Sequence, residues 1–337
     1  MPLLRAAPMT VIGAGSWGTA LAIQLAREGH PTRLWGRNAA QLDAMRRERR
    51  NQRYLPDAAF PGALEVSGNL ESALQRAPDV LIAVPSHAFR ATLQNIGPYL
   101  DAQTRIAWAT KGFEIATGLL PHQVAREVLG ARPGAVLSGP TFAREVGAGL
   151  PTAMTVASKD QRFAKELALM LSGPTFRAYT QNDIMGVEVG GAVKNVIAIG
   201  SGIADGMGFG ANTRVALIAR GLKEMMRLGV RLGAVRETFM GLAGLGDLVL
   251  TCTDDQSRNR RFGMALARGQ SVHDAQSAIA QVVEGVPAAD AVHAVARRLD
   301  VDMPICGEIY RVMHEDKPVR DAVQALMARE LRSETED

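Results

Sequence analysis

The sequence has few cysteines and no long apolar run, and each shortage excludes a class of protein. Only two of its 337 residues are cysteine, Cys252 and Cys306, which excludes a disulfide framework and suits a reducing compartment. No segment approaches the roughly 20 apolar residues of a membrane span, and the first eight residues are too short and weakly apolar for a signal peptide. We therefore expect a cytoplasmic protein with no integral membrane segment.

Aromatic residues and metal-ligand patterns are also scarce. Aromatic residues make up 5% of the chain, and although the net charge is +4, the arginines are dispersed rather than gathered into one basic patch. Nucleic acid is therefore not an expected partner, whereas an anionic small substrate accounts for local basic sites. The six histidines lack ligand spacing, so no metal is expected.

Two patterns of hydrophobic residues divide the chain. The first half alternates short β-branched runs with helical patterns, which is typical of a parallel sheet with crossover helices. Strands are expected at residues 9–12, 32–35, 65–67, 79–84, 105–109, 135–138, 153–157 and 176–179. Helical periodicity dominates from residue 183, and a polar tail covers 333–337. The expected fold is α/β: a Rossmann-type doubly wound domain at residues 1–182, followed by an all-helical domain at 183–337.

A glycine motif follows the first expected strand directly. Residues 13–18 read Gly-Ala-Gly-Ser-Trp-Gly and open a helical pattern. In this order the first glycine allows a tight turn and the second lets the backbone approach a pyrophosphate, while the third lets helix and strand pack closely. The motif predicts a dinucleotide site; the alternative is a purely structural turn.

The end of the second expected strand lacks a carboxylate. An NAD-preferring enzyme usually carries Asp or Glu there, but this chain has Gly36, Arg37 and Asn38. Because a guanidinium pairs with a ribose phosphate, NADP is preferred and NAD remains possible. The alternative is a solvated arginine in a loop.

Three further turns follow expected strands. They lie at residues 84–86, at 111–112 and at 138–141, which read Val-Pro-Ser, Lys-Gly and Ser-Gly-Pro-Thr. Doubly wound folds place ligand loops at the carboxyl ends of strands, so these turns should line one crevice. Lys111 would present an ammonium there; the alternative is a surface lysine.

The segment 188–199 is apolar nearly all round a helix, yet it contains Lys194. A buried ammonium needs partners or a shifted pKa, and both mark functional sites. Gly190 and Gly191 would let another backbone or a cofactor approach. We favour a catalytic lysine over a structural ion pair.

Two later segments carry polar residues among apolar ones. Asp247 stands alone between apolar runs, which indicates a buried, paired carboxylate or alternatively a helix N-cap. Ser257, Arg258 and Asn259 precede an apolar helix and offer hydroxyl, guanidinium and amide donors to a phosphate; the alternative is a charged helix start.

Taken together, these segments resemble one enzyme family. The motifs at residues 13–18, 111–112, 138–143, 191–195, 244–248 and 257–260 are similar in order and spacing to those of bacterial NAD(P)-dependent glycerol-3-phosphate dehydrogenase, over essentially the whole chain. The resemblance implies reversible hydride transfer between NAD(P)H and dihydroxyacetone phosphate, giving sn-glycerol 3-phosphate for glycerophospholipid synthesis.

The resemblance also implies residue roles. Lys194 would donate and accept the proton at the substrate oxygen, with Lys111 beside it and Asp247 orienting the set. Substrate contacts would be Lys111, Gly139, Thr141, Lys194, Asp247, Ser257, Arg258 and Asn259. Cofactor contacts would be Gly13, Gly15, Ser16, Trp17, Gly18, Arg37, Tyr54, Lys111, Ala143, Arg258, Val282 and Glu284. The chain departs from the family at Thr141, where serine is common, and at Asp255, where asparagine is expected and the added charge would weaken phosphate binding slightly.

Two other functions share some of these features. A β-hydroxyacid dehydrogenase of the 6-phosphogluconate type also has a glycine turn and a lysine on a glycine-led helix, but it is not expected to have the segments at 244–248 and 257–259. A regulator that senses NADPH without oxidising it would have no need of a buried lysine beside a carboxylate. The apolar helices of the second domain would suit a homodimer interface or a core equally well.

Overall fold

The computed structural model describes residues 8–279, 281–330 and 333–334. The chain divides into two compact units, one formed by residues up to Lys111 with Pro121–Ile184 and the other by Gly112–Leu120 with residues from Met185 onward. Of the polar tail expected at 333–337, only 333 and 334 lie within the described residues.

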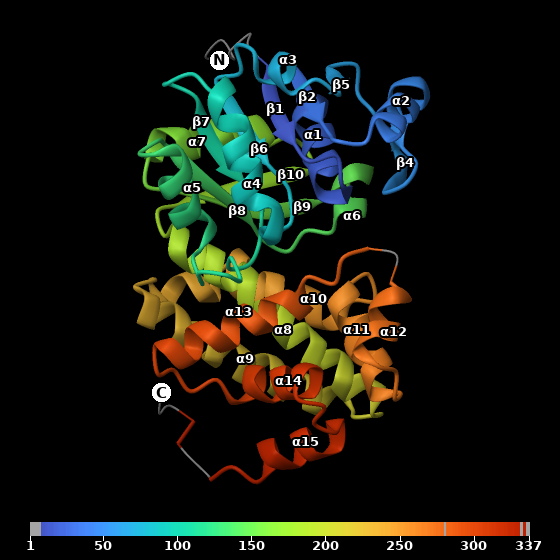
Figure 1. The fold of residues 1–337 in the computed structure, drawn as a ribbon, viewed down its shortest axis with the longest axis vertical. Helices are drawn as coiled ribbons and strands as arrows, with labels where there is room; N and C mark the ends of the chain where they lie inside the picture. Colours follow the sequence, from blue (N-terminus) through green and yellow to red (C-terminus); the bar gives the residue numbers. More distant parts are fainter. Residues whose placement is uncertain (1–7, 280, 331–332, 335–337) are drawn as a thin grey trace. The chain divides into compact units, whose positions relative to one another are not determined.

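The first unit alternates strands and helices (Figure 1). Its elements are β1 (Met9–Ile12), α1 (Ser16–Arg27), β2 (Thr32–Trp35), α2 (Ala39–Glu48), β3 (Arg50–Asn51), β4 (Leu55–Ala59), β5 (Leu64–Ser67), α3 (Leu70–Leu74), β6 (Asp79–Ile82), α4 (Ser86–Ile96), the 3₁₀ turn η1 (Gly97–Tyr99), β7 (Arg105–Trp108), α5 (Pro121–Leu129), β8 (Gly134–Ser138), α6 (Ala143–Ala148), β9 (Thr152–Ser158), α7 (Gln161–Leu171) and β10 (Phe176–Gln181).

Eight of these strands form one sheet in the order β10-β9-β8-β7-β6-β1-β2-β5. Neighbouring strands are parallel except for β8 and β9, which pair antiparallel. The expected α/β doubly wound architecture is confirmed, and each of the eight expected strands is present. The expectation of a parallel sheet is wrong for one pair, β8 and β9, because the chain that leaves β8 through the short α6 returns to the sheet edge in the opposite direction. Two further strands, β3 and β4, were not expected from the sequence and form a separate antiparallel ribbon.

Side chains alternate between the two faces of this sheet. In β1, Met9 and Val11 point into a cluster shared with α1 and α7. Thr10 points to the other face, where its hydroxyl donates to the carbonyl of Ala73 in α3. Every residue of β1 is buried, as expected for a strand covered by helices on both faces.

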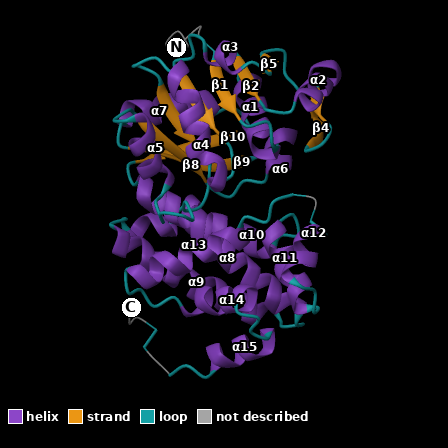
Figure 2. Cartoon of the chain, viewed as in Figure 1, coloured by secondary structure: helices purple, strands orange, loops and turns teal. Residues whose placement is uncertain are grey.

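The second unit contains only helices and loops in its described part (Figure 2). Its helices are α8 (Ile184–Gly206), α9 (Ala211–Leu232), η2 (Arg236–Met240), the π-helical segment η3 (Leu242–Gly246), α10 (Asp247–Thr253), α11 (Arg258–Ala267), α12 (Val272–Ser277), α13 (Gly285–Arg298), α14 (Pro304–His314) and α15 (Val319–Met327). The expected all-helical C-terminal architecture is confirmed.

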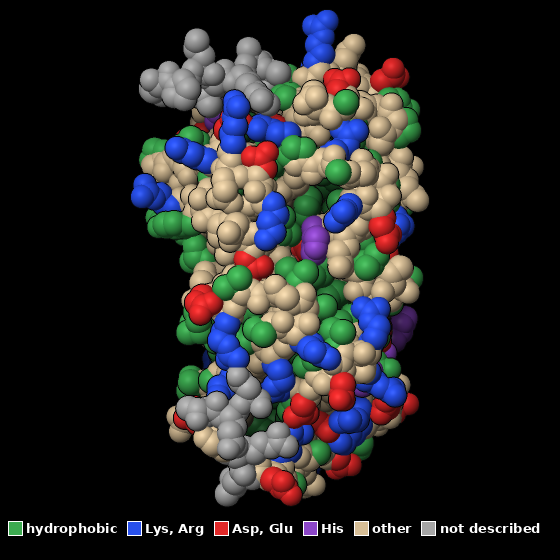
Figure 3. Space-filling model, turned by 90° about the vertical axis from the view of Figure 1, so that its left-hand side faces the viewer, with side chains coloured by type: hydrophobic (Ala, Val, Ile, Leu, Met, Phe, Trp, Pro, Cys, Tyr) green, Lys and Arg blue, Asp and Glu red, His purple; other side chains and the backbone are tan. Residues whose placement is uncertain are grey.

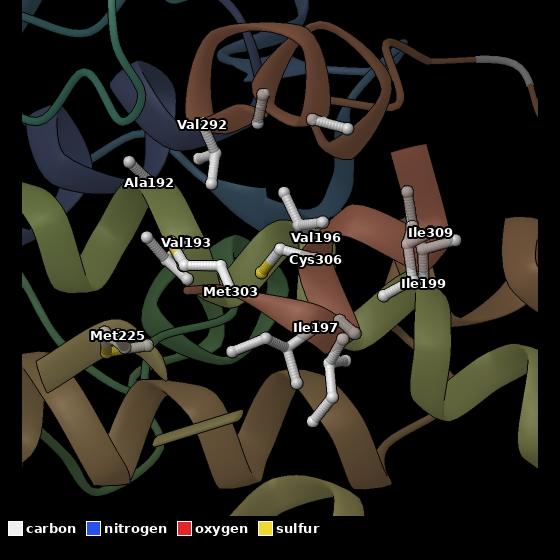
Figure 4. Packing of buried hydrophobic residues seen from close by; sticks show 14 of the residues in the cluster. Ala192, Val193, Val196, Ile197, Ile199, Met225, Val292, Met303, Cys306 and Ile309 are labelled. Atoms are coloured by element: carbon white, nitrogen blue, oxygen red, sulfur yellow. The ribbon is translucent and has the colours of Figure 1, made fainter. Parts of the chain in front are cut away.

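Helix α8 is the central helix of this unit. Its side chains Val193, Val196 and Ile197 pack among residues of α9, α13 and α14 (Figure 4). At 23 residues it is long and apolar enough to cross a membrane, although the sequence analysis found no such run. It is 94% buried in the protein over its apolar window, as a core helix would be. Burial on all sides accounts for the lack of a polar face in its sequence.

Basic and acidic side chains are interspersed on the face drawn in Figure 3. Several exposed or half-buried arginines have a nearby acidic partner, as in Arg46–Asp43, Arg90–Glu127 and Arg311–Glu308. The described arginines are thus dispersed, as their positions in the sequence indicate.

A buried carboxylate joins α9 to α14. Glu224 of α9 accepts hydrogen bonds from the backbone N–H groups of Ile305 at 2.6 Å and Cys306 at 3.0 Å. These groups belong to the first turn of α14, which has no side-chain cap of its own. Burial raises the pKa of Glu224 to about 7, outweighing the two N–H donors, which lower it.

This shift makes the stability of the protein depend on pH. The folded pKa lies above the ordinary value of 4.5, so Glu224 stabilises the fold fully below pH 4.5 and loses that contribution as pH rises through about 7. The loss is about 3 kcal/mol at most.

Glu224→Gln should be less stable than the wild type at pH 5, because glutamine offers one acceptor fewer to the two N–H groups. The difference should shrink by pH 8, because the wild type loses stability as Glu224 ionises and the variant does not. Urea unfolding from pH 5 to 8, with the exposed Glu237→Gln as control, measures this; a constant wild-type-to-variant difference would contradict it.

Candidate functional site

The turn after β1 has the geometry of a dinucleotide-binding loop. Gly13 has φ +119°, and a Cβ there would come within 2.5 Å of the Ala83 carbonyl oxygen, so only glycine fits. At Gly18 a Cβ would collide with the Gly13 carbonyl oxygen. At Gly15, by contrast, a Cβ would meet nothing within 4 Å. The protein's own atoms thus require the first and third glycines, whereas the second borders open space.

That open space lies at the N-terminus of α1. Gly15 is the N-cap residue and no side chain caps the helix, so its first N–H groups face the space beside the turn. Ser16 and Trp17 form the first turn and are half-buried. The Trp17 indole Nε1 is buried and has no hydrogen-bond partner among the described residues. Uncapped N–H groups, an open glycine and an unsatisfied indole fit a pyrophosphate and its attached groups.

The loop after β2 presents a basic side chain. Arg37 is exposed, and no hydrogen bond or ion pair to another described residue engages it. Asn38 caps α2 by accepting from the Gln41 N–H at 2.9 Å. Tyr54, in the turn between β3 and β4, is half-buried under the Arg53 guanidinium, which lies 5.2 Å from the ring centroid. The end of β2 thus carries a free guanidinium and no carboxylate.

The carboxyl ends of β6, β7 and β8 share one edge of the sheet, since these strands are adjacent and parallel. The Thr110 hydroxyl donates to the Val84 carbonyl at 2.7 Å and joins two of the turns. Half-buried Lys111 follows it. Gly139, with φ +151°, and Thr141 follow β8, and Ala143 begins α6. This edge unites the turns that the sequence analysis expected to line one crevice.

Lys194 lies within α8 and is 7% exposed. Its ammonium donates to Asp247 Oδ1 at 2.5 Å and to Thr251 Oγ1 at 2.9 Å. Asp247, the first residue of α10, is 1% exposed and does not cap its own helix. The Thr251 hydroxyl accepts from Lys194 and donates to the Asp247 carbonyl at 2.5 Å. The lysine and carboxylate that the sequence singled out are thus hydrogen-bonded in the interior of the helical unit.

The backbone before α10 lets Asp247 reach α8. The π-helical segment η3 lies so close to α8 that a Cβ at Gly190 would come within 2.5 Å of the Ala243 carbonyl oxygen. The close neighbour of Gly190 is therefore the chain's own backbone. Single π turns inside helical segments are frequent at functional sites. Here the turn directly precedes the buried carboxylate.

The three polar residues at the start of α11 make contacts within the protein. Ser257 is the N-cap residue and accepts from the Arg260 N–H at 3.2 Å. Arg258 is half-buried and donates to Gln281 Oε1 at 3.3 Å. Asn259 is buried; it donates to Asn195 and accepts from the Gly285 N–H. The start of α11 thus combines a capped, positively polarised helix end with a guanidinium.

Asn195 connects this helix start with α13. It accepts from Asn259 at 2.8 Å and donates to Glu284 at 3.5 Å. Glu284 is the N-cap residue of α13 and is half-buried, whereas Val282 is exposed. Two successive residues of α8 therefore contact different helices. Lys194 binds α10, whereas Asn195 connects α11 with the start of α13.

Two residues of this arrangement were missed in the sequence. Thr251 lies four residues after Asp247, a spacing that places both side chains on one helix face, and this signal was available. Asn195 follows Lys194 directly, and an amide in an apolar helix could have been singled out for the same reason as the lysine.

Asp255 stands where asparagine was expected, and its effect on phosphate binding stays a prediction. Its carboxylate pairs with Arg260, which also pairs with Asp205 at 2.7 Å. The charge of Asp255 is thus compensated by a buried guanidinium.

A cavity of about 570 Å³ lies at the other edge of the sheet, at the amino ends of β6, β7 and β8. It is bordered by Arg105, whose guanidinium pairs with Asp79 at 2.5 Å. Because β1 and β6 are parallel, this edge is opposite the one that carries the glycine turn. The cavity contains none of the candidate site residues.

Comparisons with known proteins agree over most of the chain. Residues 8–164 match the family model described as NAD-dependent glycerol-3-phosphate dehydrogenase N-terminus, and residues 183–324 match the corresponding C-terminus. A protein of Aeromonas hydrophila named glycerol-3-phosphate dehydrogenase (NAD(P)+) is 55% identical over 328 residues, which cover 97% of this chain and 98% of that protein. A protein of Serratia proteamaculans with the same name is 56% identical over 330 residues, which cover 97% of each chain.

A solved structure is similar to the same extent. Glycerol-3-phosphate dehydrogenase from Coxiella burnetii has a TM-score of 0.93 and 49% identity, covering 96% of this chain and 99% of that one. With both family models matched along the sequence, the chain belongs to the NAD-dependent glycerol-3-phosphate dehydrogenase family.

Proposed function

We propose that this protein is an NAD(P)-dependent glycerol-3-phosphate dehydrogenase that interconverts dihydroxyacetone phosphate and sn-glycerol 3-phosphate for glycerophospholipid synthesis. The observation that carries the proposal is the buried Lys194–Asp247 hydrogen bond, in a chain whose relatives have that name. An ammonium is an expensive group to bury, and its retention beside a carboxylate is typical of acid–base sites.

Lys194 acts as the proton donor in reduction and as the acceptor in oxidation. When bound, the nicotinamide group supplies or accepts the hydride. Negative charge develops on the substrate oxygen as the carbonyl carbon is reduced, and an ammonium directed at that oxygen stabilises the charge and then delivers the proton. Asp247 and Thr251 hold the ammonium in place, and the Asp247 carboxylate compensates its charge. Lys111 supplies a second ammonium at the substrate oxygen.

The phosphate end of the substrate is assigned to the start of α11. Arg258 offers a charged donor, and Ser257 and Asn259 lie beside it at the positively polarised helix end. Gly139 and Thr141 at the sheet edge complete the substrate contacts.

The cofactor is assigned to the glycine turn, with NADP preferred and NAD possible. Support comes from the open space at Gly15, the uncapped start of α1 and the free guanidinium of Arg37 at the end of β2. The remaining cofactor contacts assigned are Tyr54, Lys111, Ala143, Arg258, Val282 and Glu284.

The proposal includes a cytoplasmic location and a homodimer. Both cysteines are buried free thiols, which suits a reducing compartment. The helical unit exposes the apolar side chains of Val215, Val230, Val235 and Met240, which a second copy of the chain would cover.

The first experiment tests turnover and cofactor preference together. The loss of nicotinamide absorbance is followed with dihydroxyacetone phosphate, using NADPH and NADH in parallel. We expect oxidation of both, with NADPH preferred; Arg37→Ala should lower kcat/KM about tenfold for NADPH and leave NADH unchanged. Arg47→Ala, which removes an exposed guanidinium from the last turn of α2, is the control. Binding of NADPH without oxidation would instead favour the sensing regulator.

Replacing Lys194 should abolish turnover far more than cofactor binding. Lys194→Ala removes the proton donor, so kcat should fall by about 10²–10⁴-fold, with the Kd for NADPH changing little. Because Asp247 is then left buried without its partner, the double variant Lys194→Met/Asp247→Asn is measured alongside, as it buries no charge. Retained turnover in either folded variant would refute the role of Lys194.

Arg258→Ala should weaken substrate binding. Loss of the charged donor should raise the KM for dihydroxyacetone phosphate by about tenfold or more. Arg261→Ala, which removes an exposed guanidinium from the same helix, should leave KM unchanged. Steady-state kinetics with both variants measures this, and an unchanged KM in Arg258→Ala would argue against a phosphate contact.

A further inference from the structure

Two amide side chains converge on one carbonyl of the glycine turn. The Ala14 carbonyl oxygen accepts from Gln41 Nε2 at 3.0 Å and from Asn51 Nδ2 at 3.2 Å. Gln41 belongs to α2 and Asn51 to β3, so separate elements reach the same backbone atom. Neither residue has a role in the function proposed above.

Asn51 is held firmly in this position. It is 1% exposed, and its Nδ2 also donates to the hydroxyl of Thr19 in α1 at 2.9 Å. Its Oδ1 accepts from Gln41 at 3.5 Å, and its carbonyl accepts from the Tyr54 N–H at 3.2 Å. Each polar atom of this side chain is thus used, and the amide can adopt only one orientation.

The consequence concerns the peptide between Ala14 and Gly15. In a planar trans peptide the C=O and the following N–H point in opposite directions. With the Ala14 carbonyl held toward Asn51 and Gln41, the Gly15 N–H points away from them. Gly15 is the N-cap residue of α1 and borders open space, where a pyrophosphate would accept from N–H groups.

We infer that Asn51 and Gln41 are positioning residues that fix the Ala14–Gly15 peptide with its N–H directed at the cofactor pyrophosphate. The inference rests on the proposed function, because it requires a dinucleotide at the turn. If the peptide were not held, it would rotate among orientations, and each binding event would have to select the competent one.

A purely structural role is the alternative, in which the two amides only join α2 and the β3–β4 ribbon to α1. In that role, substitution would lower the melting temperature without changing the affinity of the folded protein. A positioning role instead changes cofactor affinity specifically, while kcat and the KM for dihydroxyacetone phosphate stay unchanged.

The experiment measures the Kd for NADPH by its fluorescence in the whole protein. The variants are Asn51→Ala, Gln41→Ala and their combination, each with its melting temperature and steady-state constants. Asn51→Ala should raise Kd about tenfold and Gln41→Ala about threefold, since the buried amide makes more of the contacts. The KM for NADPH should rise in parallel, and kcat should stay within about twofold.

Asn69→Ala is the matched control. Asn69 caps α3 by accepting from the Ser72 N–H at 2.8 Å, so its loss destabilises the same unit without touching the glycine turn. Gln41→Ala serves if Asn51→Ala does not fold, because Gln41 is only half-buried. An unchanged Kd in a folded Asn51→Ala or Gln41→Ala, or an equal rise in Asn69→Ala, would overturn the inference. Failure of the wild type to bind NADPH would overturn the proposed function, and this inference with it.

Discussion

The candidate site of the helical unit depends on one interaction, the buried hydrogen bond between the Lys194 ammonium and the Asp247 carboxylate. Burying either charge without the other would cost on the order of several kcal/mol of desolvation. The pair therefore requires that α8 and α10 keep a fixed distance and register. The π-helical segment η3 and the close approach at Gly190 meet that requirement.

The same requirement explains why α8 is apolar on nearly every side. A helix that presents Lys194 to α10 and Asn195 to α11 and α13 is surrounded by other helices, so most of its remaining side chains are apolar. In the other unit, the backbone of the glycine turn is held by hydrogen bonds from Asn51 and Gln41 and by close packing at Gly13 and Gly18, and open space borders Gly15.

The sequence allowed the fold class, all eight strands of the main sheet and the buried Lys194 and Asp247 to be predicted, because each depends on a local pattern. The reversed direction of β9 could not be predicted, since it is determined by pairing with β8 and not by any residue of its own. The β3–β4 ribbon is too short for a periodic signal. Asn51 is an ordinary polar residue locally, and only its tertiary contact with Ala14 distinguishes it. Thr251 and Asn195 did have local signals, in the spacing from Asp247 and in the apolar helix around the amide, but their partners Lys194 and Asn259 are known only from the tertiary structure.

The buried charge pair also limits how far this protein can be adapted to heat. A hydrocarbon pair of similar volume at positions 194 and 247 would pack without the cost of desolvating two ions, and such replacements often stabilise proteins. Selection for thermal resistance alone would therefore remove the two groups on which the proposed chemistry depends. Adaptation of this enzyme to higher temperatures has to come from elsewhere in the molecule, such as its surface, its loops and its helix ends.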